Sequence, residues 1–156
     1  MKLRLIAAGT RLPEWIDAGF DSYARRLPPE SRLELSEIRV VRHRSQGADA
    51  RALTEEGARM LAAIAPAAWV VALDAGGRSL DTPAFARWLA GRMRAGRDLA
   101  FLIGGPEGLA PACRARANEA LSLSALTYAH GLVRVVLAEQ LYRAISLLKG
   151  HPYHRE

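Results

Sequence analysis

The sequence has little cysteine, lysine or aromatic content, and it contains no long apolar run. Cys113 is the only cysteine among 156 residues, which excludes a disulfide scaffold and a zinc site built from several cysteines. No segment approaches the ~18 consecutive apolar residues that a membrane-spanning helix needs. Half of the residues are hydrophobic and 24% are charged, as in ordinary globular proteins, so intrinsic disorder is excluded as the main state.

The basic residues are almost all arginines. Twenty-two Lys and Arg residues face 16 Asp and Glu residues, which gives a net charge of +6, and 20 of the 22 are arginine. Arginine binds phosphate in a bidentate manner and stacks on bases, so this balance favours a nucleic-acid partner. Biased genome composition is the alternative explanation, because alanine is also very abundant.

The length and the N-terminal segment set the expected class of protein. A chain of 156 residues suits one domain spanning residues 1–156, with a core that needs neither disulfides nor metal. The apolar part of the N-terminal segment covers only residues 5–8, which is too short for a secretory signal. We therefore expect a cytoplasmic protein with no membrane contact.

Strand and helix patterns alternate along the chain, which predicts an α/β fold with a mostly parallel sheet and helices on both faces. Continuous or alternating apolar residues bounded by Gly or Pro indicate the strands, and helical spacing of apolar residues indicates the helices. Strands are predicted at 2–8, 33–41, 69–73, 99–103 and 121–127, and helices at 13–27, 49–65, 81–95, 111–118 and 132–148.

Glycine-rich turns follow three of these strands, at residues 9–10, 74–77 and 104–108, and residues 127–131 follow the last one. Parallel sheets bind ligands at the carboxyl ends of their strands. Glycine in such turns allows backbone N–H and C=O groups to approach a ligand closely. Three such turns along one edge of the sheet predict a ligand site there.

The common nucleotide and metal motifs are missing from this predicted site. The dinucleotide fingerprint fails, because Ile103 occupies its first glycine position when Gly105 and Gly108 occupy the others. No phosphate loop and no zinc-protease motif occurs, and His151 and His154 lack a third ligand in sequence, so we expect no metal. Cys113 is expected to be a buried hydrophobic residue rather than a nucleophile.

The last helix is so apolar that we expect it to be buried, in part at a subunit interface. Glu139 and Arg143 are four residues apart on it, and they form either an ordinary helical ion pair or a functional pair. Arg134 lies on the same helix just after the loop of the fifth strand, where it could meet an anion.

The tail at residues 151–156 concentrates polar and aromatic side chains. Tyr153 could stack on a base, Arg155 could hold a phosphate, and His154 could take part in proton transfer. Two groups of arginines are candidate RNA-facing surfaces, although each is as well explained as a solvated surface. They are Arg42, Arg44 and Arg51, and Arg87, Arg92, Arg94 and Arg97.

Several segments together resemble the RlmH family. They are Leu-Ile-Gly-Gly-Pro-Glu-Gly-Leu at 102–109, Leu-Ser-Leu-Ser-Ala-Leu-Thr at 121–127, residues 134–143, and His-Pro-Tyr-His-Arg-Glu at 151–156. The start of the chain, through Gly9-Thr10 to Trp15, is similar as well. The resemblance covers essentially the whole length, and the combination of the glycine turn with the terminal segment is highly specific.

The resemblance implies a SPOUT-class methyltransferase. Members of the RlmH family transfer a methyl group from S-adenosylmethionine to N3 of a pseudouridine in 23S rRNA, and we expect the assembled ribosome as substrate. The resemblance further implies a homodimer and a C-terminal trefoil knot. Pattern reasoning alone argues against a knot, because knots are rare in proteins.

The resemblance also implies roles for particular residues. Tyr128-Ala129-His130-Gly131 departs from some relatives, a change that should be tolerated if the contacts there are made by the backbone. We expect His154, Tyr153 and Arg143 to be catalytic, and Arg155, Arg134 and Glu139 to bind RNA. The expected cofactor contacts are Leu73, Gly105, Ser124, Ala125, Leu126, Thr127, Tyr128 and Ala129.

Two other classes of function remain open from the sequence. A nucleotide-binding α/β enzyme that uses NAD is disfavoured by the missing fingerprint. A ribosome-binding module without catalytic activity would leave the three glycine turns without a purpose. Binding of NAD and of S-adenosylhomocysteine distinguishes these alternatives from a methyltransferase.

Overall fold

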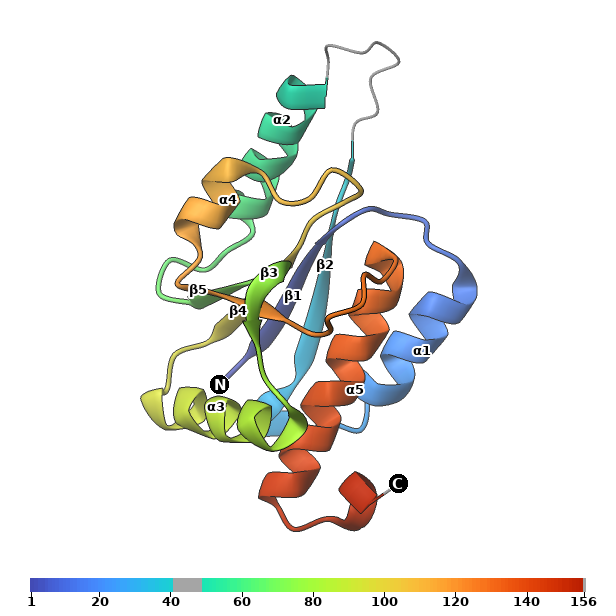
Figure 1. The fold of residues 1–156 in the computed structure, drawn as a ribbon, viewed down its shortest axis with the longest axis vertical. Helices are drawn as coiled ribbons and strands as arrows, with labels where there is room; N and C mark the ends of the chain where they lie inside the picture. The colour runs from blue at the N-terminus through green and yellow to red at the C-terminus, as the bar shows by residue number, and fades with distance from the viewer. Residues whose placement is uncertain (41–48, 156) are drawn as a thin grey trace.

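A computed structural model describes residues 1–40 and 49–155, with the backbone alone for Asp49, His154 and Arg155. Five strands form one sheet in the order β2-β1-β4-β3-β5, and every neighbouring pair is parallel (Figure 1). This architecture confirms the predicted parallel α/β sheet. The strands are β1 (Leu3–Ala8), β2 (Leu33–Ile38), β3 (Trp69–Ser79), β4 (Leu99–Ile103) and β5 (Glu119–Ser122).

Helices cover both faces of the sheet, as predicted. On one face, α1, α3 and α5 pack over a core that includes Phe20, Phe85, Leu89 and Leu137. On the other face, α2 and α4 pack over a smaller core around Met60. The helices are α1 (Glu14–Ala24), α2 (Asp49–Ala62), α3 (Thr82–Ala95), α4 (Pro111–Arg116) and α5 (His130–Leu148), with short 3-10 helices η1 (Pro29–Ser31) and η2 (Pro152–Arg155).

The central strands are buried because their sequences are apolar throughout. All five residues of β4 are buried, as expected for a strand covered by helices on both faces. β1 lies between β2 and β4, so that Leu3 pairs with both Leu33 and Leu99. The loops that follow β4 and β5 therefore come together at one edge of the sheet, beside residues 73–75 of β3.

α3 begins and ends where the sequence predicts. The Asp81 side chain accepts a hydrogen bond from the backbone N–H of Ala84 at 2.8 Å, and Pro83 occupies the first turn, where its missing N–H costs nothing. The helix ends at Gly96, which adopts φ of 75°, a conformation that glycine reaches without strain.

The predicted limits of three strands are wrong. β2 ends at Ile38, before the limit predicted for the strand at 33–41. β3 continues past Leu73 to Ser79, with a shift in its register against β5 between Leu73 and Arg78. Gly77 makes this possible, because a Cβ atom there would lie 2.7 Å from backbone atoms of Ala120 and Leu121. β5 ends at Ser122, so the predicted strand at 121–127 is mostly loop.

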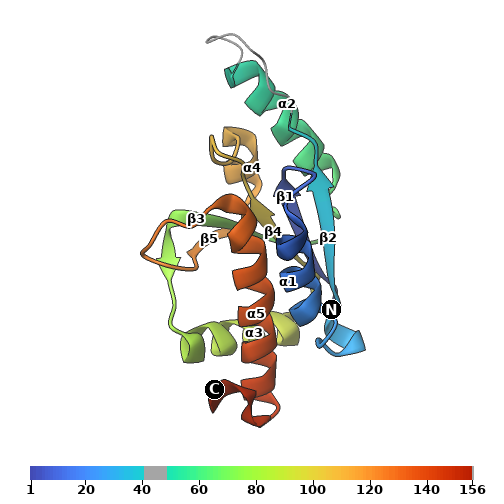
Figure 2. The ribbon, with the colours of Figure 1, turned by 90° about the vertical axis from the view of Figure 1, so that its right-hand side faces the viewer.

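α5 runs along the sheet and ends at the opposite edge of the molecule from the strand-end loops (Figure 2). Gly150 has φ of 71° and redirects the chain, after which η2 packs back against α5. Among the helices that the structure describes, none has the length and apolarity that crossing a membrane requires.

Candidate active site

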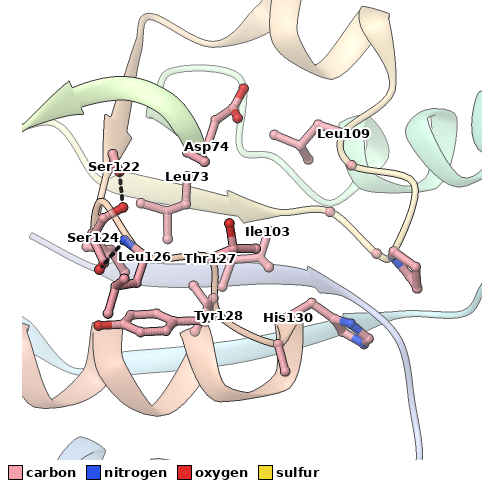
Figure 3. Close-up of a pocket in the computed structure, with 18 of the residues that line it drawn as sticks. Leu73, Asp74, Ile103, Leu109, Ser122, Ser124, Leu126, Thr127, Tyr128 and His130 are labelled. Atoms are coloured by element: carbon pink, nitrogen blue, oxygen red, sulfur yellow. Dashed lines mark hydrogen bonds between the residues drawn. The ribbon is translucent and has the colours of Figure 1, made fainter.

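A cavity of about 410 Å³ lies where the loops after β4 and β5 meet the bulge of β3 (Figure 3). Its size falls within the range of roughly 300–1,000 Å³ that is typical of small-molecule sites. The strand-end position agrees with the ligand site predicted from the glycine turns. The lining residues are 73–75, 103–106, 108–109, 122–124 and 126–130, together with Arg114 and Val133.

The turn at 104–108 forms one wall of the cavity, and its shape depends on glycine. The N–H of Gly108 donates to the carbonyl of Gly105 at 2.9 Å, and Gly108 has φ of 78°. A Cβ atom on Gly104 would lie 2.4 Å from the backbone of Gly108. Any side chain at position 104 would therefore force this turn open.

The loop between β5 and α5 forms the facing wall, and two serines fix it. The Ser122 hydroxyl donates to the carbonyl of Ser124 at 2.8 Å, and the Ser124 hydroxyl accepts from the N–H of Leu126 at 2.9 Å (Figure 3). These local bonds compete with strand pairing, which explains why β5 stops at Ser122. Leu126 is left 73% exposed at the rim of the cavity.

The structure brings seven of the eight predicted cofactor contacts together around this cavity, while Ala125 is exposed and lies outside the lining. The predicted turn at Gly9-Thr10 also lies outside the lining, although a Cβ atom on Gly9 would lie 3.7 Å from Nε2 of His130. The seven residues are Leu73, Gly105, Ser124, Leu126, Thr127, Tyr128 and Ala129.

An ion pair in the cavity wall joins Asp74 on β3 to Arg114 on α4. The hydrogen bond from Arg114 holds the pKa of Asp74 below its usual range, and the backbone N–H of Gly76 adds to this effect. The sequence predicts Asp74 in a strand-end turn, but it contains no sign that Arg114 on α4 pairs with this carboxylate.

Arg134 lies inside the protein, which overturns its expected contact with RNA. Its side chain is 1% exposed, and Nη1 donates to Oε2 of Glu37 at 2.7 Å. Nη2 donates to the carbonyl of Gly9 at 2.8 Å and approaches that of Ala8 at 3.5 Å. Arg134 thus ties α5 to the ends of β1 and β2, beside the cavity.

Glu139 and Arg143 form a close ion pair on α5, with Arg143 Nη2 2.7 Å from Glu139 Oε1. Glu139 also accepts from Gln140 at 2.7 Å and from the Tyr153 hydroxyl at 3.1 Å. These contacts engage both oxygens of Glu139 within the chain. The structure therefore places Glu139 as the residue that holds the tail, in contrast to the expected contact with RNA.

Tyr153 is packed against α5. Its ring lies 4.6 Å from that of Tyr142, and the guanidinium of Arg143 lies 5.0 Å from its centre. Burial, the hydrogen bond with Tyr23 and the neighbouring Glu139 carboxylate raise the pKa of Tyr153 above its ordinary value. Tyr153 is therefore protonated at neutral pH, and its hydroxyl donates to Glu139.

The tail begins at the end of α5 that lies opposite the cavity. His130, at the start of the helix, lines the cavity, and Tyr153 follows its far end. The tail folds back along the helix, so that the Tyr153 hydroxyl meets Glu139, nine residues after His130 and about 14 Å from it along the axis at 1.5 Å per residue. Tyr153 therefore lies outside the lining of the cavity in its own chain, in contrast to the expectation that it lies near the strand-end site.

Several expected contacts with RNA fall outside what the structure describes or are engaged elsewhere. Arg42 and Arg44, and the side chains of His154 and Arg155, lie outside the described part. Arg92 stacks 4.1 Å from the centre of the Trp69 ring, and Arg97 donates to the carbonyls of Ala67 and Ala68 at 2.9 and 3.2 Å, while Arg51 pairs with Glu55. Arg87 and Arg94 are exposed.

Two further expectations concern reactive and metal-binding groups. Cys113 is fully buried and its Sγ lies 3.5 Å from the carbonyl of Gly57, which confirms that it is a packed core residue. Burial raises the pKa of its thiol. Within residues 1–40 and 49–155, no group of three or more His, Cys, Asp or Glu side chains could hold a metal ion.

The fold is similar to that of a solved structure. A probable methylase family protein from Haemophilus influenzae Rd KW20 superposes with a TM-score of 0.57, covering 97% of this chain and 69% of that chain, at 10% sequence identity. At this identity the likeness shows the fold alone. It agrees with the parallel sheet and the strand-end cavity described above.

Similarity in sequence identifies the family, which the similarity in fold does not. A family described as "Predicted SPOUT methyltransferase" matches residues 1–154. Proteins named ribosomal RNA large subunit methyltransferase H are similar along their whole length: 57% identical in Thioalkalivibrio sulfidiphilus, covering 100% of both chains, 58% in Alkalilimnicola ehrlichii, covering 99% of both, and 50% in Methylococcus capsulatus, covering 99% of this chain and 100% of that one.

These matches confirm the resemblance to the RlmH family, and the SPOUT fold implies the C-terminal trefoil knot. On the evidence of its cavity, its fold and its relatives, this chain belongs to the SPOUT methyltransferase family, and within it to the RlmH family.

Proposed function

We propose that this chain methylates rRNA of the large ribosomal subunit, using S-adenosylmethionine and one SPOUT methyltransferase domain of residues 1–156. The observation that carries the proposal is identity of 50–58% along the whole length to proteins named for that activity. The resemblance of the turn at 104–108 and of the tail to the RlmH family specifies N3 of a pseudouridine in 23S rRNA as the methylated atom.

The strand-end cavity fits the methyl donor, which supplies a methyl group on a positively charged sulfur. Leu73, Ile103 and Leu109 provide apolar surface for a planar base. Asp74 and Arg114 carry one charge of each sign, which complements the amino-acid end of the donor. Backbone N–H and C=O groups of the turn at 104–108 and of the loop between β5 and α5 supply further hydrogen-bond donors and acceptors.

The chain accelerates methyl transfer chiefly by alignment. The turn at 104–108 and the serine-fixed loop are rigid, so they hold the cavity wall in one shape while the RNA base is brought into line. The proton on the pseudouridine N3 must leave, and we assign its acceptance to His154. Tyr153 serves as a donor, and Arg143 and Arg155 balance the charge of the RNA backbone.

We infer that the enzyme is a homodimer in which the tail of one chain completes the cavity of the other. The inference rests on the position of Tyr153, whose hydroxyl meets Glu139 in the middle of α5, about 14 Å along the helix from His130 at the cavity, so that Tyr153 does not line the cavity of its own chain. A dimer with two-fold symmetry brings the two tails to the two cavities by the same set of contacts.

The proposal is tested with ribosomes from cells that lack this gene. Purified protein and labelled S-adenosylmethionine are incubated with intact ribosomes, separated subunits or naked rRNA, and the methylated nucleosides are mapped by mass spectrometry. We expect methylpseudouridine at one site in 23S rRNA, with intact ribosomes as the best substrate.

Calorimetry with S-adenosylhomocysteine and with NAD distinguishes the competing functions. Binding of S-adenosylhomocysteine alone supports a methyltransferase. Binding of NAD alone would support a nicotinamide-dependent enzyme. Binding of neither, together with the absence of methylation on every substrate, would contradict the proposal and favour a ribosome-binding module.

A further inference from the structure

The carboxylate of Glu119, at the start of β5, accepts hydrogen bonds from two tryptophan side chains. Nε1 of Trp69 on β3 and Nε1 of Trp88 on α3 both donate to its Oε1, each at 2.8 Å. One carboxylate oxygen can accept two such bonds, and a bond to a charged acceptor is stronger than one between neutral groups. Glu119 therefore fastens β5 both to the neighbouring strand and to the helix that covers the two strands.

The second oxygen of this carboxylate reaches a later part of β3. Nη2 of Arg78 donates to Oε2 at 3.4 Å. Leu73 and Arg78 both pair with Leu121 of β5, so the residues between them, 74–77, form a bulge in β3. Trp69 precedes this bulge and Arg78 follows it. A single carboxylate thus joins the two arms of the bulge.

The bulge at 74–77 forms part of the wall of the strand-end cavity. Asp74 and Ala75 line the cavity, and the ion pair with Arg114 holds the bulge at Asp74. Another part of the lining begins at Ser122, three residues after Glu119 on the same strand. Glu119 itself lies outside the lining, so any effect that it has on a ligand passes through these two segments.

Both indole groups that bind Glu119 are themselves held in place. The guanidinium of Arg92 lies 4.1 Å from the centre of the Trp69 ring, and Trp88 stacks on Phe85 with ring centres 5.4 Å apart. Packed aromatic rings have few rotamers available, so the two N–H groups keep a constant direction. Glu119 is therefore attached to a rigid part of the molecule at one oxygen and to the far arm of the bulge at the other.

We propose that Glu119 is a positioning residue for methyl-donor binding, which closes the base of the bulge at 74–77 and so holds Asp74 and Ala75 in the cavity wall. The inference rests on the proposed use of S-adenosylmethionine. Glu119 acts through the bulge and does not touch the donor. Its task requires two acceptor atoms, one for the indole groups and one for Arg78.

Two substitutions remove these bonds in steps. Glu119→Gln keeps an oxygen for the two indole groups but turns an amide N–H group towards Arg78, which is also a donor. Glu119→Ala removes every bond. We expect S-adenosylhomocysteine to bind E119Q about threefold and E119A about tenfold more weakly than the wild type, because a loosened bulge must be ordered when the ligand binds. In the methylation assay, E119A should raise KM for S-adenosylmethionine and leave kcat nearly unchanged.

Glu34 provides the matched control. It lies on β2, at the opposite edge of the sheet from β5, and pairs with Arg4 of the neighbouring strand at the same 3.4 Å. E34A should therefore bind S-adenosylhomocysteine as the wild type does. Melting temperatures recorded alongside separate folding from binding, because a purely structural role lowers stability and leaves the affinity of the folded protein intact. A folded E119A with wild-type affinity would overturn the inference, as would an equal loss of affinity in E34A.

A second measurement uses the wild-type protein. Coupling between two sites is reciprocal, so if the bonds of Glu119 strengthen ligand binding tenfold, the bound ligand strengthens those bonds by the same factor. Saturating S-adenosylhomocysteine should therefore slow hydrogen exchange at the indole N–H groups of Trp69 and Trp88 about tenfold in NMR spectra. The chain has three tryptophans, and Trp15, which is 61% exposed, provides the reference for an open indole.

Unchanged exchange at both indole groups in the saturated protein would overturn the inference, even if every Glu119 variant failed to fold. Failure of the wild type itself to bind S-adenosylhomocysteine is a different result, which contradicts the proposed function.

Discussion

Arg134 joins α5 to the ends of two strands through bonds to Glu37 and to the carbonyl of Gly9. Because its side chain is almost fully buried, Arg134→Ala leaves these groups without a partner and opens a cavity. We expect the free energy of unfolding to fall by about 3–5 kcal/mol in urea denaturation. Arg87→Ala, at an exposed position, should change it by less than about 0.5 kcal/mol. Equal effects of the two substitutions would show that the buried bonds contribute nothing.

Asp74 gives stability a defined dependence on pH. Arg114 lowers the pKa of Asp74 in the folded state, so the pair stabilises the protein at pH values above the ordinary carboxyl range. That contribution is lost as the pH falls through the lowered pKa. We therefore expect Asp74→Asn to destabilise the protein at pH 7, and the difference from the wild type to shrink as the pH falls below about 4.

Urea denaturation of both proteins between neutral and acidic pH tests this expectation. Arg114→Gln should reproduce the effect, because it removes the partner of the same carboxylate. A difference between D74N and the wild type that is independent of pH would contradict the role of the ion pair.

The residues of the site were predictable to different degrees. Backbone-lined turns are marked by glycine, so the sequence located the cavity, and the resemblance supplied seven of the residues that line it. The bonds of Arg134 with Glu37 and of Glu139 with Tyr153 were not predictable, because a helix sequence does not specify which distant strand or tail its charges meet. The pairing of Glu139 with Arg143 was expected from their spacing of four residues. The burial of Glu56 on α2 was not predictable either, since an acidic residue on a helix is usually exposed.

The start of α3 offers a test at the scale of an element. Asp81 accepts from the Ala84 N–H and so satisfies one of the free donors in the first turn. Asp81→Ala should lower the free energy of unfolding by about 1 kcal/mol in urea, and Asp81→Ser should restore most of it. A loss of the same size in D81S would show that the cap contributes through charge alone.

Gly76 and Gly77 form a natural pair for testing the close approach of β3 to β5 at the shift in their register. A Cβ atom on Gly77 would strike the backbone of Ala120 and Leu121 at 2.7 Å, whereas one on Gly76 would meet nothing within 4 Å. We expect Gly77→Ala to cost more than about 2 kcal/mol of stability and to weaken S-adenosylhomocysteine binding. Gly76→Ala should leave both the stability and the S-adenosylhomocysteine affinity unchanged. Similar behaviour of the two variants would contradict the close approach of Gly77 to the backbone of β5.

Elements with strong local signals were predicted well. α3 and β4 have the expected limits, because a capping residue, glycine and a continuous apolar run mark them. The end of β5 was misplaced, since alternating Leu and Ser in 121–127 imitates a half-buried strand. The serine hydroxyls bond to the backbone of their own loop, and a hydrophobic pattern does not reveal that competition.

At the scale of the whole molecule, the separation of tail and cavity predicts complementation between two inactive variants. Thr127→Trp fills the cavity and His154→Ala removes the proton acceptor, so each homodimer should be inactive. Mixed dimers contain one intact cavity facing one intact tail, and an equal mixture should recover about a quarter of the wild-type activity.

The mixture is prepared by co-expression, and methylation is measured on ribosomes from cells that lack the gene. Restored activity requires that the tail acts on the partner's cavity. A mixture as inactive as its components would show that each chain uses its own tail. An unchanged single-turnover rate in H154A alone would remove His154 from the chemistry.

The order of the strands was beyond the reach of sequence patterns. Local periodicity indicates a strand but contains no information about its neighbours, and the parallel pairing of β1 with β4 joins residues far apart in the chain. The knot expected of the family has the same origin, because threading is a property of the complete path.

The pairing of β1 with β4 also determines the order of events during synthesis. Leu3 pairs with Leu99, so the apolar strand β1 leaves the ribosome about 96 residues before its inner neighbour. At a translation rate of roughly 5–20 residues per second, the side of β1 that pairs with β4 keeps its hydrogen-bonding groups unpaired for about 5–20 seconds. The nascent chain therefore exposes β1, a buried strand of the finished protein, for most of its translation. During that interval the apolar strand is most open to aggregation and to binding by a chaperone.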